Sequence, residues 1–419
     1  MSGKPNILFV GNYNREDYVR LLEASKDHCN LYFLFFASPN EEQSQLYKTY
    51  GQAIYWKDFE SAQQLIKSII PDKVVFLYIE SYNHVVLNLA CKEAGIPTYL
   101  LEHGLRADYV VGFDPSISPA PKRSLVSSVL WYIQLIRDFT PRLKSRKFLN
   151  NSLKQLQIEN HSFAEEFIKV RKHHNYLQTS KKVAYYKRTP ETYISFSPQI
   201  FKIHQKEERF KNNKQVYFIG IPYFDHLANI SEKKPIKSIL FFDQPLAEHN
   251  LLGWTKDFKE SFSQNLATTC NDLGYELLVK LHPTQSSLTW QQLAKQYRIK
   301  LVSDEDIMHL TPHLRLVVGF YSTYLLPFAA LKHITVVTYE NHPAGNFMLS
   351  KALTKSGVAN VIYNLQELKS IVGDLSMIHH KQLNYKANFI ADWLYKFDGQ
   401  SGKRLKEILT SENYNLITK

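Results

Sequence analysis

The run Tyr275-Glu-Leu-Leu-Val-Lys-Leu-His282-Pro283 decides the fold class of this chain. Its apolar residues are typical of a buried β-strand, and the proline ends that strand because it cannot donate a hydrogen bond to a neighbouring strand. His282 therefore directly follows the carboxyl end of a strand. Ligands of α/β sheets bind outside the carboxyl ends of the strands, so His282 is a candidate to donate a hydrogen bond or a proton to a departing phosphate. The alternative is a histidine that only caps a loop.

Apolar runs of this kind alternate with helical stretches along both halves of the chain. Strands are predicted in the first half at Ile7–Val10, Leu31–Phe36, Val74–Tyr78 and Thr98–Leu101, and again near the middle of the chain at Val216–Pro222. In the second half they are predicted from Ser238, from Tyr275, from Lys300, from Leu314 and from Ile334. Continuous apolar strands separated by helices indicate parallel sheets covered on both faces. A chain of 419 residues is too long for one ordinary core. We therefore expect an α/β protein of two doubly wound domains that face each other across a cleft.

The composition of the chain changes at three places, which predicts its domain boundaries. The first domain is expected at 1–230, with a basic helical insertion at about 121–188. A polar linker at 229–235 precedes a second domain at 236–390. The remaining residues, 391–419, form a helical tail that we expect to pack back on the first domain.

The net charge of +12 points to an anionic partner. Within 122–147 seven Lys and Arg residues stand against a single acid. This segment is either an amphipathic helix with a solvated basic end or a surface for anionic lipid or an acidic acceptor. We find no nucleic-acid motif, so a non-catalytic polyanion-binding protein is the less favoured class, and no nucleic acid is expected as a partner. No run approaches the roughly 18 apolar residues that span a bilayer, and three scattered cysteines suit a reducing compartment. We expect a cytoplasmic protein, with peripheral contact to the inner membrane.

Two further strand ends carry residues that suit group transfer. Glu102-His103-Gly104 follows the strand at Thr98, and either ionisable side chain could take a proton from an attacking hydroxyl. Neighbouring side chains on a strand point to opposite faces, so both are not expected to reach one ligand. Gly319-Phe-Tyr-Ser322-Thr323 follows the strand at Leu314, and we expect Ser322 or Thr323 to stand at a helix N-terminus, where anions bind. The alternative for each motif is a charged turn and an ordinary helix cap.

Several other chemistries lack their motifs. The chain has no Walker loop and no Gly-x-Gly-x-x-Gly, which disfavours ATP hydrolysis and dinucleotide binding. Asp304-Glu-Asp306 matches an Asp-x-Asp metal motif, but it falls between a strand and a predicted helix, where acids serve as N-caps. We therefore predict no metal and no cofactor.

At these strand ends the chain resembles the bacterial sialyltransferase and polysialyltransferase group of GT-B glycosyltransferases. Members carry an acidic-acidic-Gly motif, a His-Pro motif and a Ser-Ser or Ser-Thr pair. The counterparts here are Glu102-His103-Gly104, His282-Pro283 and Ser322-Thr323. The turn Phe242-Asp-Gln244-Pro245 is similar to the Gln-Pro turn that opens the second domain in these enzymes and in related Kdo transferases.

The resemblance implies an inverting, metal-independent transferase that uses a CMP-activated acidic sugar. It implies that Glu102 is the general base, that His282 assists the departure of CMP, and that Ser322 and Thr323 hold its phosphate. The further candidates for nucleotide contact are Gln244, Pro283, Lys280 and Gly319, and those for acceptor contact are Asn12, Arg106 and Arg137. The predicted function is transfer of a nonulosonic acid, of sialic acid or Kdo type, to a capsule or lipopolysaccharide glycan. The expected partners are the nucleotide-sugar donor and an anionic glycan or glycolipid acceptor.

One position departs from the group's pattern. The middle residue of the first motif is His103 and not an acid. A His-Gly pair here is similar to teichoic-acid-type glycerophosphotransferases, which use CDP-glycerol. The alternative function is therefore a CDP-glycerol glycerophosphotransferase or another nucleotide-sugar transferase of envelope polymer synthesis, and His103 is the alternative base.

Overall fold

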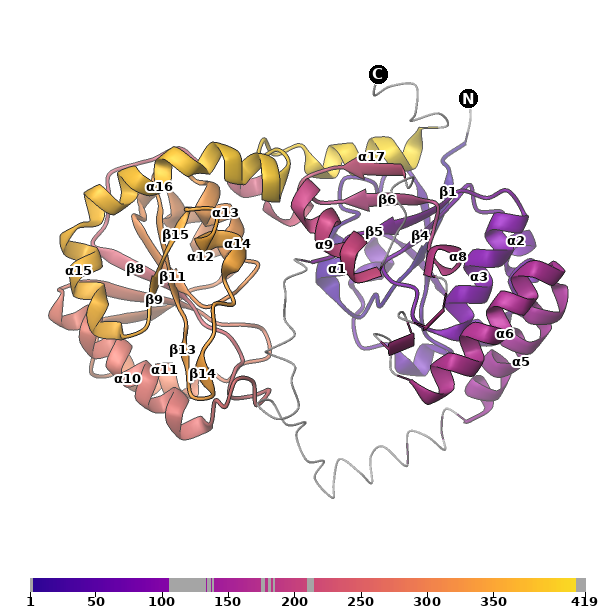
Figure 1. Cartoon of the computed structure of the whole chain (residues 1–419), viewed down its shortest axis with the longest axis horizontal. Helices are drawn as coiled ribbons and strands as arrows, with labels where there is room; N and C mark the ends of the chain where they lie inside the picture. The colour runs from indigo at the N-terminus through magenta and orange to yellow at the C-terminus, as the bar shows by residue number, and fades with distance from the viewer. Residues whose placement is uncertain are drawn as a thin grey trace. The chain divides into compact units, whose positions relative to one another are not determined.

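The structure is a computed structural model that describes residues 3–104, 133, 137, 139–174, 178–179, 182–183, 185–208 and 215–411. It divides into two compact units, each a parallel sheet covered by helices (Figure 1). Unit 1 comprises Met1–His103, Arg123–Tyr223 and Gln400–Lys419. Unit 2 comprises Gly104–Lys122 and Phe224–Gly399. No helix in the described ranges has the length and apolar character needed to cross a membrane.

Unit 1 contains a seven-stranded parallel sheet in the order β3-β2-β1-β4-β5-β6-β7. Its strands are β1 (Asn6–Val10), β2 (Asn30–Leu34), β3 (Gly51–Ile54), β4 (Lys73–Phe76), β5 (Thr98–Leu101), β6 (Thr192–Ser195) and β7 (Gln215–Phe218). Its α-helices are α1 (Glu16–Arg20), α2 (Ala62–Ile69), α3 (Tyr82–Glu93), α5 (Phe139–Gln155), α6 (Ile158–His173), α8 (Tyr185–Arg188), α9 (Pro198–Glu208) and α17 (Ser401–Thr410). The five strands predicted here are confirmed as β1, β2, β4, β5 and β7, whereas β3 and β6 lack a strong apolar run and were not predicted.

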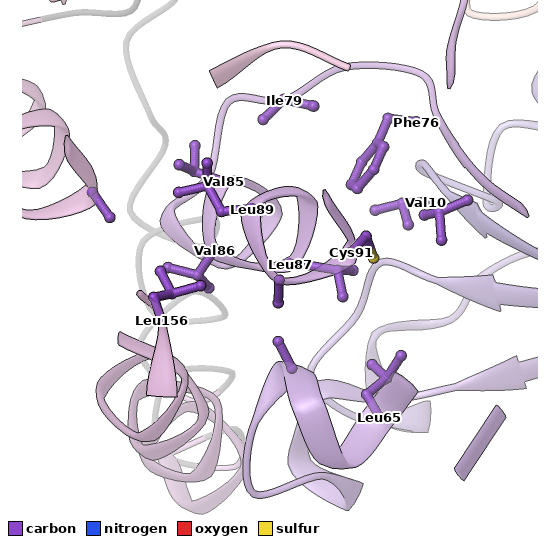
Figure 2. Packing of buried hydrophobic residues seen from close by; sticks show 14 of the residues in the cluster. Val10, Leu65, Phe76, Ile79, Val85, Val86, Leu87, Leu89, Cys91 and Leu156 are labelled. Carbon is purple, nitrogen blue, oxygen red and sulfur yellow. The ribbon is translucent and has the colours of Figure 1, made fainter. Parts of the chain in front are cut away.

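The core of unit 1 is built around α3, which is buried on all sides. Every residue from His84 to Cys91 is buried, which is typical of a helix with neighbours all round. Val85, Leu89 and Leu156 belong to one apolar cluster with Val10 and Phe76 of the sheet (Figure 2). This packing fixes the strands of the sheet, and with them the residues that follow their carboxyl ends.

The C-terminal helix α17 belongs to unit 1 and is held there by a buried lysine of β4. Nζ of Lys73 donates hydrogen bonds to the carbonyl oxygens of Ile408 at 2.6 Å, Leu409 at 3.0 Å and Ser411 at 2.6 Å. The last carbonyls of a helix have no partner within the helix, and a cation there also complements the helix dipole. Lys73 thus fastens the end of the described chain to the sheet.

Unit 2 contains a six-stranded parallel sheet in the order β10-β9-β8-β11-β12-β15 and a small hairpin. Its strands are β8 (Ser238–Phe242), β9 (Glu276–Lys280), β10 (Ile299–Leu301), β11 (Leu316–Gly319), β12 (Thr335–Tyr339), β13 (Asn341–His342), β14 (Gly345–Asn346) and β15 (Ala359–Ile362). Its α-helices are α10 (Lys256–Asp272), α11 (Leu288–Leu293), α12 (Asp304–Leu310), α13 (Leu325–Ala330), α14 (Lys351–Thr354), α15 (Leu368–Gly373) and α16 (Leu375–Phe389). The five strands predicted here are confirmed as β8 to β12, and the edge strand β15 was not predicted.

Consecutive residues of β8 face different helical layers. The ring of Phe241 packs on Phe262 of α10 and on Trp290 of α11, with centroids 5.9 and 6.0 Å away. The ring of Phe242 packs on Phe328 of α13 at 5.0 Å. Because side chains alternate across a strand, these contacts show that helices cover both faces of the sheet, as a doubly wound fold requires.

Candidate active site

Three neighbouring strands of unit 2 end level with one another at one edge of the sheet. In the register of the sheet Phe242 on β8 pairs with Lys280 on β9 and with Gly319 on β11. Neighbouring strands lie about 4.8 Å apart. The residues that follow these three ends therefore meet at the same edge. The structure thus brings together Gln244, His282 and Ser322, which the sequence placed after three separate strands.

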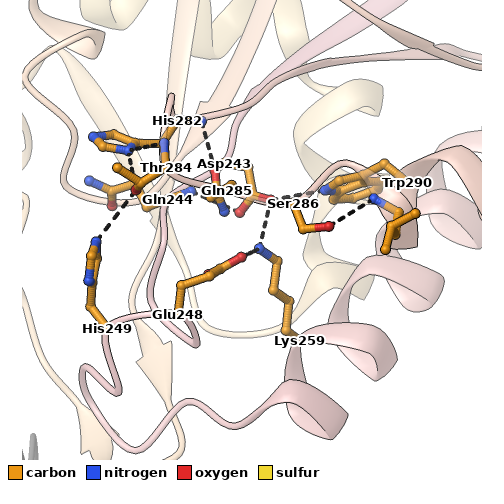
Figure 3. A network of polar contacts seen from close by, with 11 residues as sticks. Asp243, Gln244, Glu248, His249, Lys259, His282, Thr284, Gln285, Ser286 and Trp290 are labelled. Carbon is orange, nitrogen blue, oxygen red and sulfur yellow. Dashed lines mark hydrogen bonds and ion pairs between the residues drawn. The ribbon is translucent and has the colours of Figure 1, made fainter. Parts of the chain in front are cut away.

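His282 stands in a short turn whose residues bind its ring and its backbone (Figure 3). Its Nδ1 atom lies 2.9 Å from Oγ1 of Thr284, and the backbone N–H of Thr284 donates to Nδ1 at 3.3 Å. The backbone N–H of His282 donates to Oε1 of Gln285 at 2.7 Å. The ring itself is exposed, as is Pro283. Contacts at Nδ1 therefore set the orientation of the His282 ring, while the ring remains accessible to a ligand.

A set of charged side chains, of which Asp243 and Lys259 are buried, lies behind this edge (Figure 3). The Oδ1 atom of Asp243 accepts the backbone N–H of Gln244 at 2.8 Å, and Oδ2 accepts Nε1 of Trp290 at 2.9 Å. Nζ of Lys259 lies 3.5 Å from Oδ2 of Asp243 and 2.7 Å from Oε1 of Glu248. Burial raises the pKa of Asp243, although Lys259 and the hydrogen bonds act in the opposite direction. These contacts fix the residues that directly follow β8, among them Gln244.

Sequence reasoning missed this set of charged side chains, although one signal was present. Lys259 shares its helical spacing with the buried residues Phe262, Leu266 and Cys270, so a lysine stands on the apolar face of α10. A charged side chain on a buried face needs a partner of opposite charge. That requirement predicts a buried acid beside α10, but not which acid.

The predicted position of the Ser-Thr pair needs a correction. Helix α13 begins at Leu325 with Tyr324 as its N-cap, so Ser322 and Thr323 lie in the turn before the helix and not at its start. The cause is a local hydrogen bond, since Oγ of Ser322 accepts the backbone N–H of Tyr324 at 3.2 Å. The preceding residue is bound as well, because the N–H of Tyr321 donates to Oε1 of Gln244 at 3.3 Å. Gln244 is thereby linked to the turn that carries Ser322.

Two other predicted contact residues support the edge from below. Nζ of Lys280 lies 3.1 Å from Oδ1 of Asp304, which also accepts the hydroxyl of Tyr324 at 2.7 Å. Burial acts to raise the pKa of Asp304, but the Tyr324 hydroxyl and the Lys280 ammonium outweigh it and leave that pKa below its ordinary value. At Gly319 a Cβ atom would come within 3.2 Å of the Leu325 side chain, so glycine lets α13 pack closely on β11.

The Asp-x-Asp motif serves as a helix start. Ser303 is the N-cap of α12 and forms a capping box with Asp306, whose carboxylate accepts the Ser303 N–H at 2.9 Å. Over the described ranges no group of three or more His, Cys, Asp or Glu side chains could hold a metal ion.

In unit 1 the first motif divides its two ionisable side chains between two environments. Oε2 of Glu102 lies 3.3 Å from Nδ1 of His204 on α9, and both side chains are 2% exposed. His103 is half-buried, and its ring stands edge-on to Tyr18 at 5.0 Å and to Tyr78 at 5.8 Å. The sequence offered no signal for His204, because its contact with Glu102 joins residues about a hundred positions apart.

Two of the predicted acceptor-contact residues, Asn12 and Arg137, lie in unit 1. The backbone N–H of Asn12, two residues after β1, donates to the hydroxyl of Tyr78 at 3.2 Å, which places Asn12 near the ring that packs on His103. Nη2 of Arg137 donates to the carbonyl oxygen of Asn40 at 3.1 Å. Arg106 lies outside the described residues.

Solved structures with similar folds cover the whole chain. They include CalG4, the calicheamicin glycosyltransferase, with a TM-score of 0.55 and 11% identity over 100% of both chains. The glycotransferase of kitacinnamycin has a TM-score of 0.52 and 11% identity over 98% of this chain and 100% of its own. The wall teichoic acid polymerase TagF, soaked with CDPG, has a TM-score of 0.51 and 11% identity over 100% of this chain and 90% of its own. At this identity the likeness shows the fold alone: the protein has the GT-B glycosyltransferase fold, with two Rossmann-like domains.

The family follows from the sequence match. A family model described as Alpha-2,8-polysialyltransferase (POLYST) matches residues 6–341. The chain belongs to the alpha-2,8-polysialyltransferase family and is a glycosyltransferase, which confirms the resemblance seen at the strand ends. No curated protein sequence matches the chain.

Proposed function

We propose that this glycosyltransferase moves a nonulosonic acid, of sialic acid or Kdo type, from a CMP-activated donor to a bacterial capsule or lipopolysaccharide glycan. The observation that carries the proposal is the common edge of β9, β8 and β11, which presents His282, Gln244 and Ser322 together in a chain of this family. We further propose that the transfer inverts the anomeric centre and needs no metal.

Unit 2 would hold the leaving nucleotide. In the reaction the bond between the anomeric carbon and the phosphate oxygen breaks, and the acceptor oxygen bonds to that carbon. The negative charge that develops on the phosphate is best met by fixed donors, which here are the imidazole of His282 and the hydroxyls of Ser322 and Thr323. Gln244, Lys280, Pro283 and Gly319 shape and support the same edge, so they are expected to affect binding of the nucleotide more than the chemical step.

Unit 1 would supply the base. A general base must come within hydrogen-bond reach of the acceptor hydroxyl. The Glu102 carboxylate is buried against His204, whereas the His103 ring is half-buried beside two tyrosine rings. We therefore propose His103 as the base and the Glu102–His204 pair as the buried support behind it, with Glu102 retained as the alternative base.

A nucleotide panel tests the donor. CMP is expected to raise the melting temperature of the protein, because a ligand at 100 times its Kd adds about 2.7 kcal/mol to the free energy of unfolding. UDP and GDP serve as controls and are expected to have no effect. Stabilisation by CDP without CMP would favour the glycerophosphotransferase alternative, which the His103-Gly104 pair suggested. Loss of transfer on addition of EDTA would contradict metal independence.

Paired glutamine variants test the base. His103→Gln is expected to lower kcat by about 10²- to 10⁴-fold, as removal of a general base does, with little change in KM. Glu102→Gln is expected to have a smaller effect, because it only weakens the contact of residue 102 with His204. The reverse order of the two effects would assign the base to Glu102.

The proposal for the acceptor and its location rests on a cluster of basic residues near the start of α5. Four exposed cationic residues, Arg142, Lys144, Arg146 and Lys147, lie within one and a half turns of α5. Such a cluster attracts an anionic glycan or the headgroups of anionic lipid. We propose that it binds an anionic glycan or glycolipid acceptor at the inner membrane surface. Arg142→Ser with Arg146→Ser is expected to raise KM for the acceptor in a salt-dependent manner and to leave CMP binding unchanged.

A further inference from the structure

The hydrogen bonds at Nδ1 of His282 determine which ring nitrogen carries its proton. The backbone N–H of Thr284, 3.3 Å from Nδ1, can only donate. Nδ1 must therefore present its lone pair, and the Thr284 hydroxyl at 2.9 Å is a second donor to the same atom. A neutral imidazole whose Nδ1 accepts hydrogen bonds carries its proton on Nε2.

We propose that Thr284 is a positioning residue that holds His282 as the neutral Nε2–H tautomer, so that His282 meets the leaving phosphate as a neutral hydrogen-bond donor and not as an imidazolium. An imidazolium would carry a proton on Nδ1 as well, and that proton would point at the Thr284 N–H. Two donors facing each other leave both without an acceptor, which is unfavourable. The inference rests on the proposed function for the identity of the phosphate ligand, but the tautomer itself does not depend on it.

His249 completes the arrangement on the other side of the threonine. Its Nε2 lies 3.5 Å from Oγ1 of Thr284 (Figure 3). If Oγ1 donates its proton to His282, its lone pairs are left to accept from His249, so the three side chains form one directed chain of hydrogen bonds. His249 therefore orients the hydroxyl of Thr284, and through it the ring of His282.

The charged groups around this turn are paired with one another. Lys280, two residues before His282, is bound to Asp304, and Asp243 behind the turn is bound to Lys259. His249 is the titratable group that faces the turn through Thr284. In the step itself no proton leaves His282: CMP departs with its phosphate oxygen hydrogen-bonded to Nε2–H.

The tautomer can be read directly from nitrogen chemical shifts. Full-length protein labelled with ¹⁵N-histidine is expected to show an unprotonated Nδ1 and a protonated Nε2 for His282 at pH 7.5, with the signal assigned by its absence in His282→Gln. Thr284→Val, which is isosteric but lacks the hydroxyl, is expected to shift the ring toward a mixture of tautomers. A protonated Nδ1 in the wild-type protein would overturn the proposal, whether or not CMP is the donor.

Kinetics tests the role of the tautomer in transfer. Thr284→Val is expected to lower kcat about tenfold with KM for the donor changed less than about twofold, and Thr284→Ser is expected to restore most of the rate. Thr289→Val, a matched change at the second residue of α11, is expected to have no effect. Full activity in Thr284→Val would contradict a positioning role.

Replacement of His282 by glutamine, a neutral amide, shows whether His282 acts as a hydrogen-bond donor or as an acid. His282→Gln keeps an N–H near the position of Nε2 and is expected to retain at least about a tenth of kcat, whereas His282→Ala is expected to lose about 10²- to 10³-fold. The ratio of wild-type to His282→Gln rates is expected to stay constant from pH 6.5 to 9. A ratio that falls tenfold per pH unit would identify the imidazolium as the acting form. If CMP fails to bind while another nucleotide supports transfer, the proposed donor is wrong and the same ratios still decide the role of His282.

Discussion

A buried lysine of α16 predicts how the stability of unit 2 varies with pH. Lys386 is 2% exposed, and its Nζ donates to the carbonyl oxygens of Leu331 at 2.6 Å and Ile334 at 2.7 Å, just after α13. Burial lowers the pKa of Lys386 to about 7. The perturbation is Lys386→Met, which keeps the length and apolar stem of the side chain and removes its charge.

The sign and size of the effect follow from proton linkage. An unfolded lysine has a pKa of about 10.4, so between pH 7 and 10 the unfolded state binds more protons than the folded state. The free energy of unfolding therefore rises with pH in this window, by about 2 kcal/mol between pH 7 and pH 9 for a folded pKa near 7. Lys386→Met lacks this contribution. The wild-type protein is thus expected to gain about 2 kcal/mol on the variant when the pH is raised from 7 to 9.

Neighbouring groups do not titrate in the same window. Burial lowers the pKa of His333 and of His379 below their ordinary value, so both are already neutral at pH 7. The difference between wild type and variant therefore isolates Lys386. The charge of Lys386 is one cause of these lowered pKa values, so in the variant they are expected to rise toward the ordinary value of histidine, which still lies below the window from pH 7 to 9.

Urea unfolding followed by tryptophan fluorescence is the assay, because three of the five tryptophans, Trp254, Trp290 and Trp393, lie in unit 2. Lys381→Met, an exposed lysine on the same helix, is the control and is expected to show no such pH dependence. Equal pH dependence in wild type and Lys386→Met would refute the reasoning, because it would mean that the buried ammonium keeps its ordinary pKa.

Three other changes test contacts within unit 1 or within unit 2. Lys73→Met leaves three carbonyls at the end of α17 without their donor and is expected to cost about 2–4 kcal/mol, with faster hydrogen exchange confined to that helix. Gly357→Ala is expected to lower the free energy of unfolding, measured by thermal unfolding, by at least about 1–2 kcal/mol, because Gly357 has φ +74° and a Cβ would lie 2.8 Å from the Tyr385 ring. Gly373→Ala is the control and is expected to be neutral, because the space around Gly373 is open. Asp243→Asn removes the charge beside the buried Lys259 and is expected to lower the free energy of unfolding of unit 2 by about 2 kcal/mol. The same variant is expected to raise KM for the nucleotide. An unchanged KM would show that the contacts of Asp243 do not position Gln244.

The strands that could be predicted are those that read as continuous apolar runs. Eight of the ten predicted strands have apolar residues buried on both faces, which the composition alone reveals, and the other two, β7 and β10, are edge strands that are only partly buried. Two of the strands that were missed, β3 and β15, lie at the edges of their sheets. An edge strand has a neighbour on one side only and carries more polar residues, as Gly51-Gln-Ala-Ile54 does, so its composition does not distinguish it from a loop.

The candidate site divides in the same way between what sequence order determines and what tertiary packing determines. Strand ends could be recognised one by one, and parallel pairing then required Gln244, His282 and Ser322 to meet at one edge. The partners that fix them could not be recognised, because Lys259 and His204 reach their acids from separate helices. Which helix contacts which strand end depends on packing, and no local pattern of residues encodes it.

The turn at His282 is an exception, since its four residues encode their own geometry. Pro283 ends the strand and directs the chain away from the sheet. The N–H of Gln285 then donates to the carbonyl oxygen of His282 at 3.0 Å while the Gln285 side chain accepts the His282 N–H, so the turn is closed from both ends. That closure is what brings the Thr284 N–H to Nδ1. The local sequence His-Pro-Thr-Gln therefore determines the orientation of His282 and its proposed tautomer. A change at Thr284 or Gln285 is expected to alter the chemistry of His282 without any change in the sheet that carries it.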